Sequence, residues 1–220
     1  MELKNRDEFV AGGLSVIQSI YDKIYTLESF KLVDGLDTVL VIVDMVNGFV
    51  KEGKMSSPRI KSIIDPIVRI KSICDKKGIE TIAFCDCHLE DSVEFLSYAK
   101  HCIKGTKESE IIDELKGVRV INKNSTNGFL ESEFLKWQDA NRNICNFIVV
   151  GDCTDICVKQ FVITLKTWFD MNNRKCRIIV PIDAVETYDS DLHNAEFINA
   201  ISIYDMMQSG VEVVKNIVRG

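Results

Sequence analysis

The chain has 220 residues, of which 46% are hydrophobic, and its formal net charge is −6. This length is enough for one domain with a sizeable core, and the composition excludes disordered and fibrous proteins. The negative charge argues against nucleic acid or anionic membranes as partners, and the apolar runs are too short to span a bilayer. No signal peptide is visible in the first residues, so we expect a cytoplasmic protein.

The first 36 residues are polar and partly amphipathic, and a helix is expected around Leu14–Ile24. We interpret residues 1–36 as an N-terminal extension, largely helical, and residues 37–220 as the main domain. The extension is expected to pack on this domain or on a partner subunit of a homo-oligomer.

Six apolar runs in the main domain predict strands, because continuous apolar runs are typical of strands buried on both faces. These runs are Asp37–Asp44, Glu80–Asp86, Val118–Lys123, Phe147–Gly151, Arg177–Ile182 and Gly210–Val214. Helical patterns lie between them, at Pro58–Lys77 (closed by Gly78), Asp155–Asn172 and Asp191–Met207. The alternation predicts an α/β fold with three layers, α/β/α, around a mainly parallel six-stranded sheet.

Polar side chains gather where these strands end. In open α/β sheets ligands bind outside the carboxyl ends of the strands. Asp44, Asp86, His88 and Lys123 occupy such positions, and a short turn there leads to Cys157. A thiol at a helix start feels the positive end of the helix, which favours the thiolate.

Cys157, Asp44 and Lys123 together suggest a cysteine hydrolase. Cys157 can attack a carbonyl, Asp44 can accept and return the proton, and Lys123 can stabilise the thiolate. Backbone N–H groups near Ile156 and Cys157 could bind the oxyanion. Spacing alone leaves a second interpretation open, in which Asp44 caps a turn, Lys123 lies on the surface and Cys157 is one buried cysteine among eight.

Two of the three histidines, His88 and His101, lie close together with carboxylates around them. Asp86 precedes them, and Glu90, Asp91 and Glu94 lie between them. Mixed oxygen and nitrogen donors suit zinc, iron(II) or manganese(II). The alternative is that Asp86 caps a turn and the histidines are ordinary surface residues.

The order of these motifs resembles the isochorismatase-like cysteine hydrolases, and most closely their nicotinamidase branch. The resemblance runs from about Thr38 to the end of the chain. It rests on residues 44–49, Asp86-Cys-His88, residues 101–106, Lys123 and the stretch from Gly151 to Val158. It implies an isochorismatase-like fold, a catalytic triad of Asp44, Lys123 and Cys157, and a non-proline cis peptide near Asp152–Cys153 that helps aim the oxyanion donors, including the Cys153 N–H.

The resemblance also implies one divalent metal ion, with zinc favoured over iron or manganese, that holds the pyridine nitrogen of the substrate. The implied ligands are Asp86, His88, Glu94 and His101, with Glu90 and Asp91 as weaker alternatives to Glu94. Phe49 and Tyr98 are expected to line the ring pocket, whereas Phe95 and Phe129 are expected in the core. Cys87 and Cys102 are expected to point away from the metal.

The function implied is hydrolysis of nicotinamide to nicotinate and ammonia through a cysteine thioester, in NAD salvage. The alternative is a related amidohydrolase acting on a different small amide or ureide. The chain departs from the family pattern at Val46, at Cys87 and at the pair Asp152-Cys153, where small residues are usual. These departures concern the pocket rather than the triad.

Overall fold

The main sheet of the computed structural model has seven parallel strands. Six follow the order β4-β3-β2-β5-β6-β8, and β7 pairs with the end of β5. Their bounds are β2 Thr38–Val43, β3 Glu80–Asp86, β4 Arg119–Lys123, β5 Asn146–Asp152, β6 Arg177–Pro181, β7 Val185–Glu186 and β8 Glu212–Val214. The structure describes residues 5–33, 35 and 37–220, so residues 1–4, 34 and 36 of the expected extension lie outside the description.

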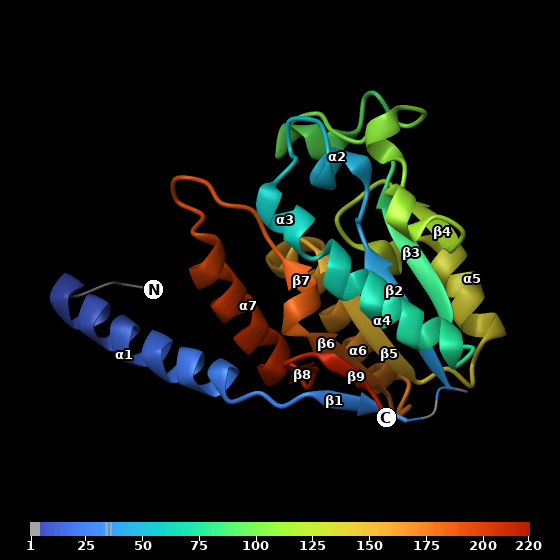
Figure 1. Cartoon of the computed structure of the whole chain (residues 1–220). Helices are drawn as coiled ribbons and strands as arrows, with labels where there is room; N and C mark the ends of the chain where they lie inside the picture. Colours follow the sequence, from blue (N-terminus) through green and yellow to red (C-terminus); the bar gives the residue numbers. More distant parts are fainter. Residues whose placement is uncertain (1–4, 34, 36) are drawn as a thin grey trace.

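Helices cover both faces of this sheet, which confirms the expected three layers (Figure 1). One layer contains α3 Pro58–Ser62 and α4 Ile64–Lys76, and the other contains α5 Ser132–Ala140, α6 Lys159–Met171 and α7 Ala195–Gln208. β2 shows why the sheet needs both layers: Val39 and Val41 pack with α6, whereas Leu40 and Ile42 pack with α4. Successive strand residues point to opposite faces, so a wholly apolar strand requires cover on both sides. The short helical turns are α2 Asn47–Val50, η1 Val93–Leu96, η2 Lys107–Ser109, η3 Asp113–Leu115, η4 Gly128–Leu130, η5 Thr154–Val158 and η6 Ile182–Ala184.

Two predicted helices differ from the observed ones. The helix expected over Pro58–Lys77 is broken at Ile63 into α3 and α4. The cause is Pro66, because a proline inside a continuous helix lacks the N–H that the helix needs, whereas it is tolerated in the first turn, where Pro66 lies in α4. The helix expected from Asp155 begins instead as a π-helical turn, η5, and becomes α-helical only at Lys159.

The N-terminal segment forms helix α1 Arg6–Tyr25, longer than expected, and strand β1 Phe30–Leu32. β1 pairs in parallel with β9 Ile217–Arg219 in a separate two-stranded sheet. Figure 1 shows α1 extending away from the main sheet, beside α7. None of the helices in the described part of the chain is long and apolar enough to cross a membrane.

Candidate active site

The ends of β4, β3, β2 and β5 place the predicted polar residues side by side at one edge of the sheet. Asp86 and Lys123 are register partners, and Asp44 follows Val43, which pairs with both Phe84 and Gly151. The chain adds strands on one side of β2 and then, from β5, on the other. Such a switch in strand order opens a crevice at the carboxyl ends.

Gly151 makes the close contact between β2 and β5 possible. A Cβ atom at Gly151 would lie 2.0 Å from the Val43 carbonyl oxygen, and its φ of +117° is a conformation that other residues rarely adopt. Asp44, on the other side of this contact, has a φ of +55°. Non-glycine residues in that conformation are strained and cluster at functional sites.

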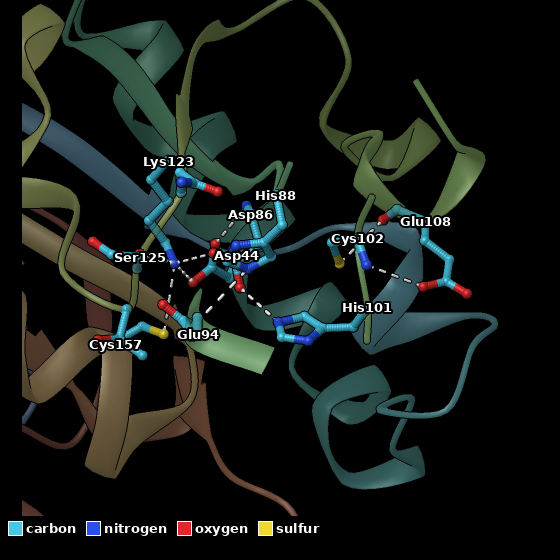
Figure 2. Close-up of polar contacts among 12 residues, drawn as sticks. Asp44, Asp86, His88, Glu94, His101, Cys102, Glu108, Lys123, Ser125 and Cys157 are labelled. Atoms are coloured by element: carbon cyan, nitrogen blue, oxygen red, sulfur yellow. Dashed lines mark hydrogen bonds and ion pairs between the residues drawn. The ribbon is translucent and has the colours of Figure 1, made fainter. Parts of the chain in front are cut away.

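Lys123 connects the nucleophile candidate to two carboxylates (Figure 2). Its Nζ lies 2.8 Å from Asp44 Oδ2 and 3.7 Å from Cys157 Sγ, and it also donates to Asp86 Oδ1. The ammonium group is buried, with 1% of the residue exposed, and it makes a further hydrogen bond to the Ser125 carbonyl. A buried cation of this kind is tolerated because the carboxylates pair with it. The arrangement rules out a surface role for Lys123.

Burial and mutual charge shift the pKa values of these four groups. Burial and the Asp86 carboxylate raise the pKa of Asp44 to about 7, with Lys123 opposing them. Burial acts against the charged form of Lys123, but the carboxylates of Asp44 and Asp86 raise its pKa well above the usual value. Burial also disfavours a charged Asp86, yet Lys123 and the two histidines hold the pKa of that carboxyl well below its usual range.

The Cys157 thiol does not have the lowered pKa that a helix start predicts. Burial raises the pKa of Cys157 well above its usual value, and Lys123 opposes this only in part. Moreover, Cys157 lies inside the π-helical turn, not at the first turn of an α-helix. Ionisation therefore needs a base beside the thiol, and Asp44 is the carboxyl that shares Lys123 with it.

The turn before Cys157 contains the expected cis peptide, between Asp152 and Cys153. The Ile156 N–H donates to the Cys153 carbonyl oxygen at 3.1 Å, so it is already engaged within the turn. The N–H groups of Cys157 and Cys153 remain the predicted oxyanion donors.

Asp86, His88 and His101 form a buried cluster in which one donor atom of each lies within 4.8 Å of the others. His101 Nε2 lies 3.4 Å from Asp86 Oδ2, and its Nδ1 is 2.7 Å from the Ala99 carbonyl, which holds the ring in this orientation. Neither ring nitrogen of His88 has a hydrogen-bond partner among the described residues, although both are buried. An orphaned imidazole beside a carboxylate fits a divalent metal ion.

Glu94 is the carboxylate nearest to this cluster among the three that the sequence offers. Its Oε1 lies 3.9 Å from His88 Nε2, and its side chain is half-buried at the cavity wall. Glu90 is exposed and pairs with Lys100, and Asp91 is exposed as well. Cys102 turns its sulfur towards the Glu108 carbonyl, and Cys87 lines a different hollow.

A cavity joins the thiol to the metal cluster, and Phe49 and Tyr98 line it as expected. The Phe49 ring centroid lies 5.3 Å from that of His101. Phe129 packs against Phe134 and Trp168 in the core, whereas Phe95 packs against both metal-cluster histidines instead. The lining residues are Phe49, Met55, Asp86, Glu94, Tyr98, His101, Thr126, Asp152, Cys153, Ile156, Cys157 and Tyr188. Its free volume is about 30 Å³, the space of roughly one water molecule.

Four wall residues were not assigned to the site from sequence, namely Met55, Thr126, Asp152 and Tyr188. Asp152 stands out there only as a departure from a family pattern, and Tyr188 follows β7 with no motif around it. Tyr188 is held by a stack with His193, whose ring centroid lies 4.0 Å away. His193 in turn contacts Asp155 at 3.1 Å, and Thr187 donates to the same carboxylate at 2.7 Å. Through these contacts the segment that contains Tyr188 is bonded to Asp155, which lies in the same turn as Cys157.

Comparison with known proteins identifies a family, and the similar proteins described below are related hydrolases. The model of the isochorismatase domain matches residues 38–215. Nicotinamidase 1 of Arabidopsis thaliana is 31% identical to this chain, over a match that covers 81% of this chain and 85% of that protein. The crystal structure of N-carbamoylsarcosine amidase from Thermoplasma acidophilum is similar with a TM-score of 0.65 and 27% identity, covering 82% of this chain and 96% of the other. The pyrazinamidase of Pyrococcus horikoshii in complex with zinc shares the fold, with a TM-score of 0.67 at 20% identity, over 81% of this chain and 99% of the other.

Proposed function

This chain belongs to the isochorismatase family of hydrolases, in its nicotinamidase branch, and we propose that it is an amidohydrolase that converts nicotinamide to nicotinate and ammonia. The observation that carries the proposal is the continuity of the site. Cys157, Asp86 and His101 line one small cavity with an aromatic wall. Lys123 and Asp44 lie behind this wall in contact with Cys157 and Asp86, and His88 belongs to the same buried cluster as Asp86 and His101. The 31% identity to nicotinamidase 1 supports nicotinamide as the substrate.

Asp44 begins the proposed reaction by accepting the proton of the Cys157 thiol. Its pKa of about 7 suits a group that must take up a proton and return it. The sulfur then attacks the carboxamide carbon, while Lys123, 3.7 Å from the sulfur, stabilises the developing thiolate. The N–H groups of Cys157 and Cys153 would hold the oxyanion.

The second half of the reaction returns the enzyme to its starting state. Asp44 gives its proton to the departing nitrogen, so that ammonia leaves and a thioester remains on Cys157. Water, deprotonated by Asp44, then attacks the thioester, which releases the carboxylate product and restores the thiol. The amide and one water are consumed, and the acid and ammonia are formed.

Asp86, His88 and His101 would hold one divalent metal ion, with Glu94 as the fourth ligand. The ion would supply a Lewis-acid contact for a ring nitrogen. Zinc is our first choice, because carboxylate and imidazole donors suit it and the Pyrococcus relative was solved with zinc, while iron and manganese remain the alternatives. Metal analysis of the purified protein tests this: one equivalent of metal in the wild type, and much less in His88→Ala, is expected. Full activity of the wild type with no bound metal would contradict it.

A ureide or another small amide is the second candidate substrate. The 27% identity to an amidase of N-carbamoylsarcosine favours this alternative. Ammonia release from nicotinamide, pyrazinamide and N-carbamoyl amino acids decides between the two. We expect nicotinamide to have the highest kcat/KM. A ureide with the highest value would replace it as the substrate, and the Cys157 chemistry would stay the same. We place the reaction in cytoplasmic NAD salvage as part of the same proposal.

A further inference from the structure

Asp152 is a buried carboxyl residue that the proposed mechanism does not use. It ends β5, where its backbone pairs with Glu186, and only 1% of the residue is exposed. It lines the same cavity as Cys157, five residues further along the chain. Asp152 is therefore part of the wall beside the place where a carboxamide must lie to react.

The carboxyl group of Asp152 lacks the partners that the two neighbouring carboxylates have. Asp44 pairs with Lys123 and accepts the Asp86 N–H at 3.0 Å, and Asp86 contacts Lys123 and both cluster histidines. Asp152 Oδ2 has no hydrogen-bond partner among the described residues. Within the described part of the chain, the one hydrogen-bond partner of Asp152 Oδ1 is the thiol of Cys153, at 3.9 Å. Buried polar groups are almost always hydrogen-bonded, so an unpaired one at a cavity wall points to a missing ligand.

The metal ion does not account for this side chain. Within the described part of the chain, the donor atoms that lie within 4.8 Å of one another belong to Asp86, His88 and His101, and Asp152 is outside that group. A structural role does not account for it either, because its strand pairing uses the backbone. An apolar side chain of similar size would suit the buried wall better than an unpaired carboxyl.

We propose that Asp152 is a substrate-binding residue whose carboxyl group accepts a hydrogen bond from a second N–H or O–H donor on the substrate, beside the scissile amide. The inference rests on the proposed amidase function and narrows its substrate class. Among pyridine carboxamides, those with such a donor, for example amino-substituted ones, are the preferred substrates, and plain nicotinamide is hydrolysed without this contact.

The test compares substrates that differ by the donor alone. Ammonia release from nicotinamide and from its ring-amino derivatives is measured for the wild type, Asp152→Asn and Asp152→Leu, each loaded with its metal. Asp152→Asn keeps a carbonyl acceptor, and Asp152→Leu is similar in size and has none. For the best amino derivative, we expect the kcat/KM ratio to nicotinamide to fall about 10- to 100-fold in Asp152→Leu, and much less in Asp152→Asn. An unchanged ratio in Asp152→Leu overturns the proposal. If the ratio is unchanged because kcat/KM falls equally for both substrates, Asp152 has a structural role instead.

Binding measured without turnover separates this inference from the proposed function. Calorimetry on Cys157→Ala, with and without Asp152→Leu, gives the affinity for nicotinamide and for the same amino derivative. The amino derivative should bind more tightly only when Asp152 is present, and equal effects of Asp152→Leu on both ligands refute the inference. If wild-type protein hydrolyses a ureide but not nicotinamide, the nicotinamide assignment fails. The ligand comparison on Asp152 then decides the inference independently.

Discussion

At the scale of single residues, the site depends on one buried lysine that neutralises the charge of the nearby carboxylates. Lys123 touches Asp44, Asp86 and Cys157, so one cation serves the base, the metal cluster and the nucleophile. The sequence could identify these residues, because each ends a strand or follows its turn. It could not show that Asp86 joins the two halves of the site, since that depends on the register of β3 with β4.

Replacing Lys123 by methionine should therefore damage both stability and activity. The change leaves two buried carboxylates without a cation, and we expect unfolding free energy to fall on the order of 3 kcal/mol. Ammonia release should fall at least ~100-fold. Lys100→Met is the matched control, because Lys100 forms an exposed pair with Glu90 and should change stability by less than about 0.5 kcal/mol. Equal stability and activity of the two variants would refute this role of Lys123.

The contact between His193 and Asp155, which supports the Tyr188 wall, should make the stability of the protein depend on pH. Burial lowers the pKa of His193, but the Asp155 carboxylate and the Tyr188 carbonyl together outweigh burial and raise the pKa above its usual value of 6.5. The pair therefore stabilises the fold fully below about pH 6.5 and loses this contribution as pH rises through the higher folded-state pKa. In urea unfolding from about pH 5.5 to about pH 8.5, the difference between wild type and His193→Gln should be largest at low pH and shrink as pH rises. A difference that grows with pH contradicts this assignment.

At the scale of elements, the sequence predicts the strands well and the irregular turns poorly. All six predicted strands are present, because continuous apolar runs are required wherever helices cover both faces. β1, β7 and β9 were missed, since each has two or three residues and depends on pairing with a distant segment. α5 was missed because its nine residues show little periodicity beyond Phe134 and Trp137. The π-helical turn around Cys157 was missed because its five residues have no apolar pattern of their own.

The contact between β2 and β5 makes Gly151 a sensitive position. Gly151→Ala places a Cβ atom 2.0 Å from the Val43 carbonyl, and it also strains the backbone. Gly117→Ala is the control, because Gly117 has a φ of +91° but no atom of the described residues lies within 4 Å of the added Cβ. Strain alone should cost about 1–3 kcal/mol in the control. Gly151→Ala should cost more in thermal unfolding and should also lower kcat, since Asp44 and Cys157 flank the contact. Equal costs would show that the close contact is relaxed.

At the scale of the whole molecule, the two elements of the N-terminal segment, α1 and β1, contact the rest of the protein in different ways. β1 is bonded to the C-terminal strand β9, whereas α1 extends beside α7 with several apolar side chains exposed, including Phe9, Leu14 and Tyr25. A domain that begins at residue 37 stays a prediction. The pairing of β1 with β9 indicates that residues 30–32 belong to the folded unit, and the sequence of the extension alone gave no sign of this.

Two truncated chains test whether β1, but not α1, belongs to the folded unit. A chain of residues 28–220 keeps β1 and should retain the activity and most of the thermal stability. A chain of residues 37–220 removes the partner of β9 and the buried Leu32, and its Tm should fall at least ~5 °C further. Circular dichroism melting and ammonia release measure both effects. Equal Tm values for the two chains would place the domain boundary after β1.

Cys157 carries the central claim, that a thiol paired with Lys123 and Asp44 attacks a small amide. The most direct measurement is ammonia and nicotinate release from nicotinamide by the metal-loaded wild type and by Cys157→Ala, with circular dichroism to confirm that the variant is folded. We expect equal amounts of the two products from the wild type and a rate at least ~1,000-fold lower from Cys157→Ala. Folded Cys157→Ala that releases ammonia at a rate near that of the wild type would contradict the account.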